Sequence, residues 1–239
     1  MSKSNVPTAI GPEAYTFWRG TSLGTITETI EHRLILDMMG DLAGARVLDA
    51  GCGDGVLACV AAERGAEVTG VDPDPAMLAA ARSRAAKAGL QETFLEGRVE
   101  RLPFPDSTFD VVVSVTVLCF VADAAGAVRE MARVLRPGGR LVLGELGRWS
   151  VWAMLRRVRG WLGSATWKKA RFRTGSELRG LAEQARLSVT AVRGSVYYPP
   201  VSLFARALAP LDSRFGGLTT FGAAFIALSA VSASERSET

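Results

Sequence analysis

A predicted β-strand that runs directly into a glycine-rich turn constrains the fold of this chain more than any other feature. Arg46–Ala50 (RVLDA) has the composition of a buried strand, Gly51–Gly55 (GCGDG) that of a turn, and a helical pattern begins at Val56. Because glycine has no Cβ, such a turn lets the backbone approach a ligand closely. Open α/β sheets bind nucleotides at this place, the carboxyl end of a strand. The motif therefore predicts an α/β fold with a ligand site directly after Ala50.

Strand and helix patterns alternate along the rest of the chain. Further strands are predicted at Glu67–Val71, Glu92–Glu96, Phe109–Val115, Arg140–Leu146, Val189–Tyr198 and Gly222–Ala230. Helices are predicted at Ile26–Met39, Val56–Arg64, Pro75–Ala88, Ala124–Leu135, Thr174–Ala185 and Val201–Phe215. Regular alternation of this kind predicts a mainly parallel sheet with right-handed helical crossovers.

The spacing of the glycines separates this turn from the dinucleotide fingerprint. That fingerprint needs a third glycine at position 56, which is valine here, whereas the third glycine is Gly55. Asp49 precedes the turn, where a carboxylate would repel a pyrophosphate but suits the ammonium group of an amino acid. Asp72, at the tip of the second strand, can accept hydrogen bonds from both ribose hydroxyls, or it can cap the helix that begins at Pro75. The pattern disfavours an NAD-dependent dehydrogenase.

Four segments between Ala45 and Leu146 carry a family resemblance. They are VLDAGCGDG, VTGVDPDPAMLAAAR, GRVERLPFPDSTFDVVVSV and REMARVLRPGGRLVLGEL. In this order and at this spacing they resemble the class I S-adenosylmethionine (SAM)-dependent methyltransferases. The resemblance is closest to the type 11 branch with the ubiquinone/menaquinone-biosynthesis-type enzymes. It implies a Rossmann-like, seven-stranded, mostly parallel sheet with helices on both faces and an antiparallel last strand. It also implies SAM as cofactor and direct in-line methyl transfer to a small-molecule acceptor.

We expect one methyltransferase domain over residues 1–239. Its expected parts are N-terminal cap helices in 1–44, a cofactor-binding core in 45–146, substrate-lid insertions in 147–175 and 199–216, and a flexible tail in 231–239.

The resemblance assigns roles around the methionine moiety and the ribose. Asp49, Gly51 and Gly53 would line the methionine moiety, together with Cys52 between the two glycines. Asp72 would hold the ribose.

The resemblance also places the adenine and the transferred methyl group. Pro73 and Met77 would flank the adenine, and the backbone amide of Val99 would meet its edge. Ser114 and Thr116, at the end of the fourth strand, would face the methyl group.

The sequence departs from the family pattern at one adenine-binding position. Many relatives have an acid where Arg98 stands, and that acid accepts a hydrogen bond from the adenine amino group. Arg98 cannot accept one, so backbone groups, Glu96 or Glu100 would have to replace it.

The sequence does not identify a catalytic base. The sulfonium of SAM is already electrophilic, so a base is needed only if the nucleophile arrives protonated. His32, the one histidine, and Glu145, at the end of the fifth strand, are the two candidates. A structural or exposed role is the alternative for His32.

Aromatic side chains outside the core pattern could line an acceptor pocket, with ordinary packing as the alternative. These residues are Tyr15, Trp18, Tyr197 and Tyr198.

Positive charge is concentrated in one segment. Between Arg148 and Arg186 the chain has ten Lys or Arg residues against two Glu. Such a segment suits an acidic substrate, nucleic acid or a membrane surface, or it forms a solvated helical face. Tryptophan and arginine interleave in Trp149–Arg173, a pattern that fits an anion, an aromatic ring or a lipid surface. Peripheral membrane contact through 149–173 is therefore one expectation.

Other functional classes lack their signatures or stay as alternatives. No Asn/Asp-Pro-Pro-Tyr/Phe motif follows the fourth strand, Cys119 lacks the preceding proline of cytosine-C5 enzymes, and no RNA-binding module is visible. The alternatives are an RNA or protein methyltransferase that docks through the basic segment, and a cofactor-binding but non-catalytic partner subunit.

Cysteine spacing and terminal composition set the remaining expectations. The three cysteines have no CxxC spacing, so neither a metal site nor a disulfide framework is expected. The first residues lack the apolar core of a signal peptide, and Phe215–Ser234 fits a buried strand better than a membrane span. We expect a cytoplasmic monomer or homodimer.

Overall fold

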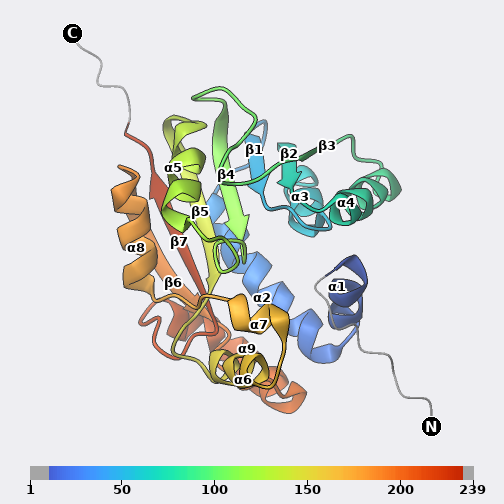
Figure 1. The fold of residues 1–239 in the computed structure, drawn as a ribbon, viewed down its shortest axis with the longest axis vertical. Helices are drawn as coiled ribbons and strands as arrows, with labels where there is room; N and C mark the ends of the chain where they lie inside the picture. Colours follow the sequence, from blue (N-terminus) through green and yellow to red (C-terminus); the bar gives the residue numbers. More distant parts are fainter. Residues whose placement is uncertain (1–10, 234–239) are drawn as a thin grey trace.

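The computed structural model describes residues 11–233, and Figure 1 shows the fold. A sheet of seven strands crosses this described range in the order β3-β2-β1-β4-β5-β7-β6. The strands are β1 Arg46–Ala50, β2 Glu67–Asp72, β3 Thr93–Glu96, β4 Phe109–Val115, β5 Leu135–Leu146, β6 Ser188–Ser195 and β7 Phe225–Val231. The pairs from β3 to β5 are parallel, whereas β7 runs antiparallel between β5 and β6. The predicted Rossmann-like sheet with an antiparallel last strand is confirmed.

Helices cover both faces of this sheet (Figure 1). In the described range they are α1 Pro12–Arg19, α2 Ser22–Met39, α3 Val56–Ala62, α4 Pro75–Lys87, α5 Ala124–Arg133, α6 Val151–Trp161, α7 Ala165–Lys169, α8 Gly175–Gln184 and α9 Ser202–Gly216. Val47 and Val111 pack in one core with α2, α3 and α4, while Leu48 and Val112 pack in a second core with α5 and α8. Neighbouring residues of β1 and β4 therefore point to opposite faces, as expected for strands covered on both sides.

Parallel pairing brings the ends of the central strands together. β2, β1 and β4 are neighbours in the sheet and end at the same edge. The arrowhead of β4 in Figure 1 points toward the end of the molecule where α6 and α7 lie. Helix α1 packs against α2 and α4 near this edge. The fold thus places the glycine turn, the strand ends and the N-terminal helices in one region.

The segment 1–44 and the two segments expected to form lids contain helices where the structure describes them. α6 and α7 have no counterpart among the predicted helices, whereas α9 matches the helix predicted at Val201–Phe215. α1 begins at Pro12, which suits a first helical turn because its missing N–H needs no partner there. The segment 147–175 contains α6 and α7, and the segment 199–216 contains α9.

One strand begins earlier than predicted. β5 starts at Leu135 rather than at Arg140, because Leu135 pairs with Phe109 ahead of the Pro-Gly-Gly turn. The register then shifts before Arg140 pairs with Val111.

Residues 215–234, considered above as a possible membrane span, contain the buried strand β7. Among the helices of residues 11–233, none combines the length and apolar character that crossing a membrane requires. From position 234 onward, the expected flexible tail 231–239 lies outside the described residues.

Candidate active site

The glycine turn combines a packed position with an open one. Gly51 has φ +86°, and a Cβ there would overlap the side chain of Val117. Gly53 has φ +53°, but a Cβ there would meet no atom within 4 Å. The backbone at Gly53 therefore borders open space at the end of β1, where a ligand can approach.

Asp72 is held by the turn and is not a helix cap. Its Oδ2 accepts a hydrogen bond from Gly53 N at 2.9 Å, and its Oδ1 accepts one from Asp74 N at 2.9 Å. The cap of α4 is Asp74, whose Oδ1 accepts from Ala76 N at 2.8 Å. Burial raises the pKa of Asp72, and the two backbone donors oppose this shift. Each carboxylate oxygen keeps capacity for a further donor, as a ribose diol requires.

Asp49 has an unsatisfied carboxylate oxygen inside the same region. Its side chain is 3% exposed, and Oδ2 has no hydrogen-bond partner. Burial raises its pKa to about 7, and the negative charge of Asp72 adds to the shift. Leaving such a group unpaired is costly, so a cationic ligand group would bind there favourably. The pair therefore fits the ammonium and ribose groups of the expected cofactor.

The expected adenine-binding residues lie beyond the end of β2. Met77, in the first turn of α4, and Val99 are buried, whereas Pro73 is exposed. Glu100 pairs with Arg98 through a 3.6 Å contact between Oε1 and Nη2. Arg98 therefore forms an ion pair with Glu100, one of the two acids that could replace the carboxylate that many relatives have at position 98.

Cys52 is a buried thiol packed inside the turn. A Cβ built at Gly70 would lie 2.8 Å from its Sγ, so the thiol fills the space that this glycine of β2 leaves. Burial raises the thiol pKa well above its usual range.

Ser114 and Thr116 shape the end of β4. Ser114 is fully buried, and its hydroxyl donates to Ala50 O at 2.8 Å, which ties β4 to β1. Thr116 has φ +55°, a region that costs a β-branched residue about 1–2 kcal/mol. Its N–H donates to Gly144 O at 2.7 Å. Strain of this kind concentrates at functional sites.

A chain of ion pairs joins the N-terminal helices to the glycine turn. The Arg19 guanidinium contacts the Asp54 carboxylate closely and reaches Glu28 Oε1 at 3.3 Å. Arg84 of α4 binds the same Asp54 Oδ2 at 2.8 Å. Asp54, the acidic residue of GCGDG, thereby links α1 to the core. The sequence pattern alone assigns no role to Asp54, because Arg19 and Arg84 lie far from it along the chain.

Tyr15 lies beside this linkage. The Arg19 guanidinium carbon is 5.8 Å from the centroid of the Tyr15 ring. Burial raises the pKa of Tyr15 to about 12, and nearby Cys119, Asp54 and Asp72 add to the shift. Tyr15 of α1 therefore lies beside the Arg19–Asp54 pair at the glycine turn.

The two candidate bases differ in accessibility. His32 of α2 is half-buried, and burial lowers its pKa to about 4, with the Arg19 charge acting in the same direction. Glu145 is 1% exposed; its Oε1 accepts from Leu118 N at 2.7 Å and its Oε2 has no partner. Burial raises the pKa of Glu145 to about 7, while Arg173 opposes the shift.

The four aromatic candidates do not share one environment. Trp18 packs edge-to-face on Trp152 of α6 with ring centroids 5.9 Å apart. Tyr198 is buried, with its hydroxyl 3.1 Å from the Thr27 hydroxyl and its carbonyl accepting from Trp152 Nε1 at 2.8 Å. The Tyr197 hydroxyl donates to the Thr219 carbonyl, on the side toward α9. Trp18 and Tyr198 therefore meet at Trp152, and Tyr197 points elsewhere.

The sequence did not predict that Arg156 of α6 packs on two tryptophans with Glu31 of α2 nearby. Arg156 stacks between two tryptophans, 5.2 Å from the Trp152 centroid and 4.9 Å from the Trp167 centroid. Burial raises the pKa of Glu31 to about 8, and the nearby Arg156 charge opposes the shift. Burial lowers the pKa of Arg156, and the negative charge of Glu31 opposes this shift. The only sequence signal was the Trp/Arg interleaving, which does not tell which arginine faces inward.

Across the described part of the chain, no group of three or more His, Cys, Asp or Glu side chains is placed to hold a metal ion.

Sequence comparison relates the chain to enzymes that transfer methyl groups. A profile described as "Methyltransferase domain" matches residues 48–143. The ubiquinone biosynthesis O-methyltransferase of Idiomarina loihiensis is 35% identical over 164 residues, which are 66% of this chain and 68% of that protein. The demethylmenaquinone methyltransferase of Thermus thermophilus is 45% identical over 115 residues, which are 47% of this chain and 52% of that protein.

Solved structures share the fold. A SAM-dependent methyltransferase of Thermotoga maritima, described as a possible histamine N-methyltransferase, has a TM-score of 0.69 at 24% identity, covering 92% of this chain and 95% of that chain. The magnesium protoporphyrin IX methyltransferase of Synechocystis, solved with S-adenosylhomocysteine (SAH), has a TM-score of 0.66 at 20% identity, covering 92% of this chain and 93% of that chain.

Proposed function

Because this chain belongs to the class I SAM-dependent methyltransferases, in their ubiquinone/menaquinone-biosynthesis-type branch, we propose that its small-molecule acceptor is an aromatic compound methylated on an ionised hydroxyl. The observation that carries this proposal is the position of Arg156 over the rings of Trp152 and Trp167, on the helix whose Ala153 packs with Cys119 of the loop after β4.

The cofactor side uses the two carboxylates at the ends of β1 and β2. When bound, SAM supplies a methyl group on an electrophilic sulfonium. Asp49 accepts the ammonium group with the oxygen that lacks a partner in the protein, and Asp72 accepts the ribose hydroxyls. The open backbone at Gly53 lets the cofactor lie against the turn.

The acceptor side uses a cation that no carboxylate neutralises directly. In the described residues, no carboxylate oxygen lies within 4.0 Å of the Arg156 nitrogens, although Glu31 is near enough to act on its charge. A cation close to a phenol-type hydroxyl lowers the pKa of that hydroxyl, because it favours the oxyanion. Arg156 would therefore hold the acceptor as its oxyanion, and the flanking tryptophans would stack on its ring.

His32 and Glu145 take different supporting roles in this proposal. A group with a pKa of about 4 is a weak base, so His32 is a neutral imidazole at neutral pH, and its N–H would donate a hydrogen bond to the oxyanion of the acceptor. Glu145 is buried beneath the loop after β4 and holds Leu118 N, so it positions that loop. Tyr15 and α1 exclude water from the reacting groups.

The proposal is tested with a panel of phenols, amines and thiols of similar size, using transfer of a radiolabelled methyl group as the readout. Phenols with a free hydroxyl are expected to be methylated. Arg156→Met is expected to lower kcat/KM at neutral pH by about 10–100-fold, as the loss of one charge-assisted contact implies. It should also shift the activity profile toward higher pH, because the hydroxyl then ionises without help.

Arg159→Met is the matched control, since Arg159 lies on the same helix but is exposed. It should leave activity and pH profile unchanged. If Arg156→Met methylates phenols as well as the wild type does, or if only amines or thiols react, the acceptor proposal is wrong. SAH binding, measured in parallel, reports on the cofactor site alone.

A further inference from the structure

Exposed apolar side chains are concentrated on α6 and α9. Trp161 is 83% exposed and Leu203 is 73% exposed. The exposed apolar residues of these helices and their flanks are Trp149, Val151, Met154, Leu155, Val158, Trp161 and Leu162, and Val201, Leu203, Phe204, Leu208, Leu211 and Phe215. Together they are called the α6/α9 face here. Described neighbours leave these side chains exposed, and large exposed apolar patches commonly mark interaction sites.

The spacing of these residues makes each helix amphipathic with its apolar stripe outward. Residues 151, 154, 155 and 158 recur every three or four positions on α6, as do 204, 208, 211 and 215 on α9. The opposite sides face the protein through Trp152 and Ala153 on α6 and through Ala205 and Asp212 on α9. Neither stripe belongs to the core.

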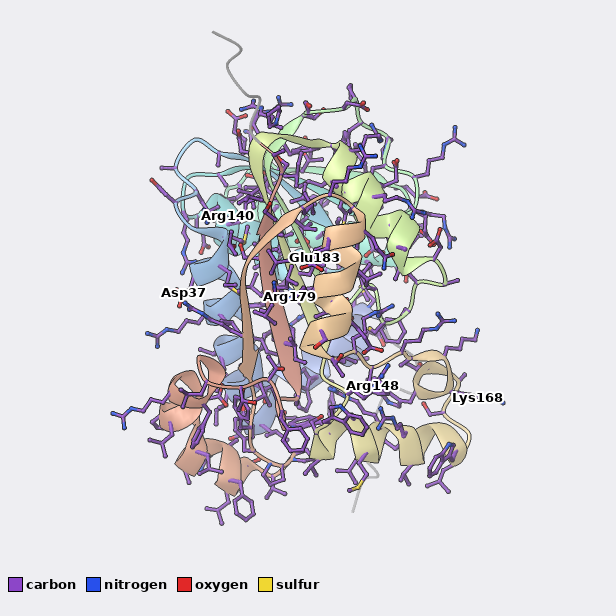
Figure 2. The ribbon with its side chains drawn as sticks, turned by 90° about the vertical axis from the view of Figure 1, so that its left-hand side faces the viewer. Asp37, Arg140, Arg148, Lys168, Arg179 and Glu183 are labelled. Carbon is purple, nitrogen blue, oxygen red and sulfur yellow. The ribbon has the colours of Figure 1, made fainter. Side chains whose placement is uncertain are left out.

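Both helices lie at one end of the molecule. Figures 1 and 2 place α6 and α9 at the same lower end in two views that differ by 90°, and side chains project outward from both in Figure 2. The hydrogen bond from Trp152 Nε1 to Tyr198 O ties α6 to the segment that leads into α9. The ends of β1, β2 and β4 face this part of the molecule, so the α6/α9 face is next to the acceptor side.

The charged side chains around the α6/α9 face are predominantly positive. Between Glu145 and Glu177 the chain has eight Lys or Arg residues and no acid. On α9 the acid is Asp212, which is buried and accepts hydrogen bonds from Val196 N and Tyr197 N. Arg159, Lys168 and Lys169 are exposed. Lys168 projects outward at the edge of this region in Figure 2.

We propose that the α6/α9 face docks on the surface of an anionic lipid membrane, with both helices lying in the interface plane. Apolar stripes bordered by cations bind such surfaces by burying apolar area among the acyl chains and by attracting anionic headgroups. A second copy of the chain fits less well, because an isologous contact would place cations opposite cations. Docking does not depend on the identity of the methyl acceptor.

The test is sedimentation of the full chain with vesicles of pure phosphatidylcholine and with vesicles that contain one third phosphatidylglycerol. The wild type is expected to bind the anionic vesicles at least tenfold more tightly than the neutral ones. Trp161→Ser with Leu162→Ser, and separately Phe204→Ser with Leu208→Ser, should each reduce binding to anionic vesicles at least tenfold. Arg159→Glu with Lys168→Glu and Lys169→Glu should reduce it by a similar factor.

A matched control reverses three exposed cations elsewhere, at Arg64, Lys87 and Arg129, and so changes the net charge equally. It should bind vesicles like the wild type. Equal loss in the control, no vesicle binding by the wild type, or a dimer in analytical ultracentrifugation that the serine variants dissociate would each overturn the proposal. SAH titration of every variant verifies the fold and separates this result from the proposed function.

Discussion

At the scale of single residues, the buried carboxylate of Asp49 is unfavourable in the free protein, and a cationic ligand group would stabilise it. Asp49 is buried without a partner for Oδ2, and burial raises its pKa to about 7. A folded-state pKa above the unfolded value means that the folded protein binds more protons over the interval between the two. The stability contributed by Asp49 is therefore greatest at low pH, and it falls as pH rises from about 4 to 7.

Asp49→Asn should separate binding from stability. The variant should unfold at a higher temperature than the wild type at pH 8 without ligand, because the buried charge is gone. Its affinity for SAM should fall by about 10–100-fold, since a charge-assisted hydrogen bond is lost. Calorimetric titrations at pH 6, 7 and 8 should show wild-type affinity rising with pH and variant affinity nearly constant. An unchanged affinity for SAM would mean that Asp49 does not contact its ammonium group.

Gly51→Ala should destabilise the fold, and Gly53→Ala should mainly impair binding. At Gly51 the added methyl overlaps Val117, and relief of such a clash typically costs about 1–3 kcal/mol. At Gly53 space is open, so only the positive φ opposes alanine, at a cost of about 1 kcal/mol. Urea unfolding measures both, and Val117→Ala should partly restore Gly51→Ala. Equal destabilisation by the two alanines would contradict this assignment.

At the scale of elements, the features best predicted from the sequence are those that depend on residues close together along the chain. β1 and β4 are found at the predicted bounds, and the capping box of α8 forms through Thr174 and Glu177. The positions of Asp49 and Asp72 at the ends of β1 and β2 could be predicted, because a strand and a turn fix both positions locally. N-terminal cap helices were expected, but the contact of Arg19 with Asp54 that places α1 was not predicted, since the two residues lie far apart along the chain. Which side of α6 faces inward was missed too, since long-range packing leaves an apolar stripe outside.

The Arg19–Asp54 pair should hold α1 over the glycine turn. Arg19→Met removes the link between cap and turn while Arg84 still binds Asp54. Hydrogen exchange of the amides in Pro12–Arg19 should accelerate about 5–10-fold, as the loss of roughly 1 kcal/mol implies. Exchange in β1 should stay unchanged.

Arg84→Met is the control for this prediction, because it leaves the cap in contact with Asp54. Faster exchange in α1 is expected only for Arg19→Met. The same acceleration in both variants would show that α1 is not held by its own contact with the turn.

At the scale of the whole molecule, the fold brings the candidate site and the α6/α9 face to one end. The parallel strands bring Asp49 and Asp72 to a common edge, Arg19 joins α1 to that edge through Asp54, and α6 and α9 lie at the same end of the molecule (Figure 1). The mainly parallel sheet could be predicted from the alternation of strand and helix patterns along the chain. The arrangement of the covering helices follows from contacts between distant segments, such as that of Trp152 with Tyr198.

Calorimetric titration with SAM, SAH and NAD tests whether the ends of β1 and β2 bind SAM. The wild type should bind SAM and SAH but not NAD. Asp72→Ala should weaken both by at least about tenfold, whereas Asp74→Ala, which removes only the helix cap, should bind like the wild type. Binding of NAD alone, or equal binding of SAM by the wild type and Asp72→Ala, would contradict the account.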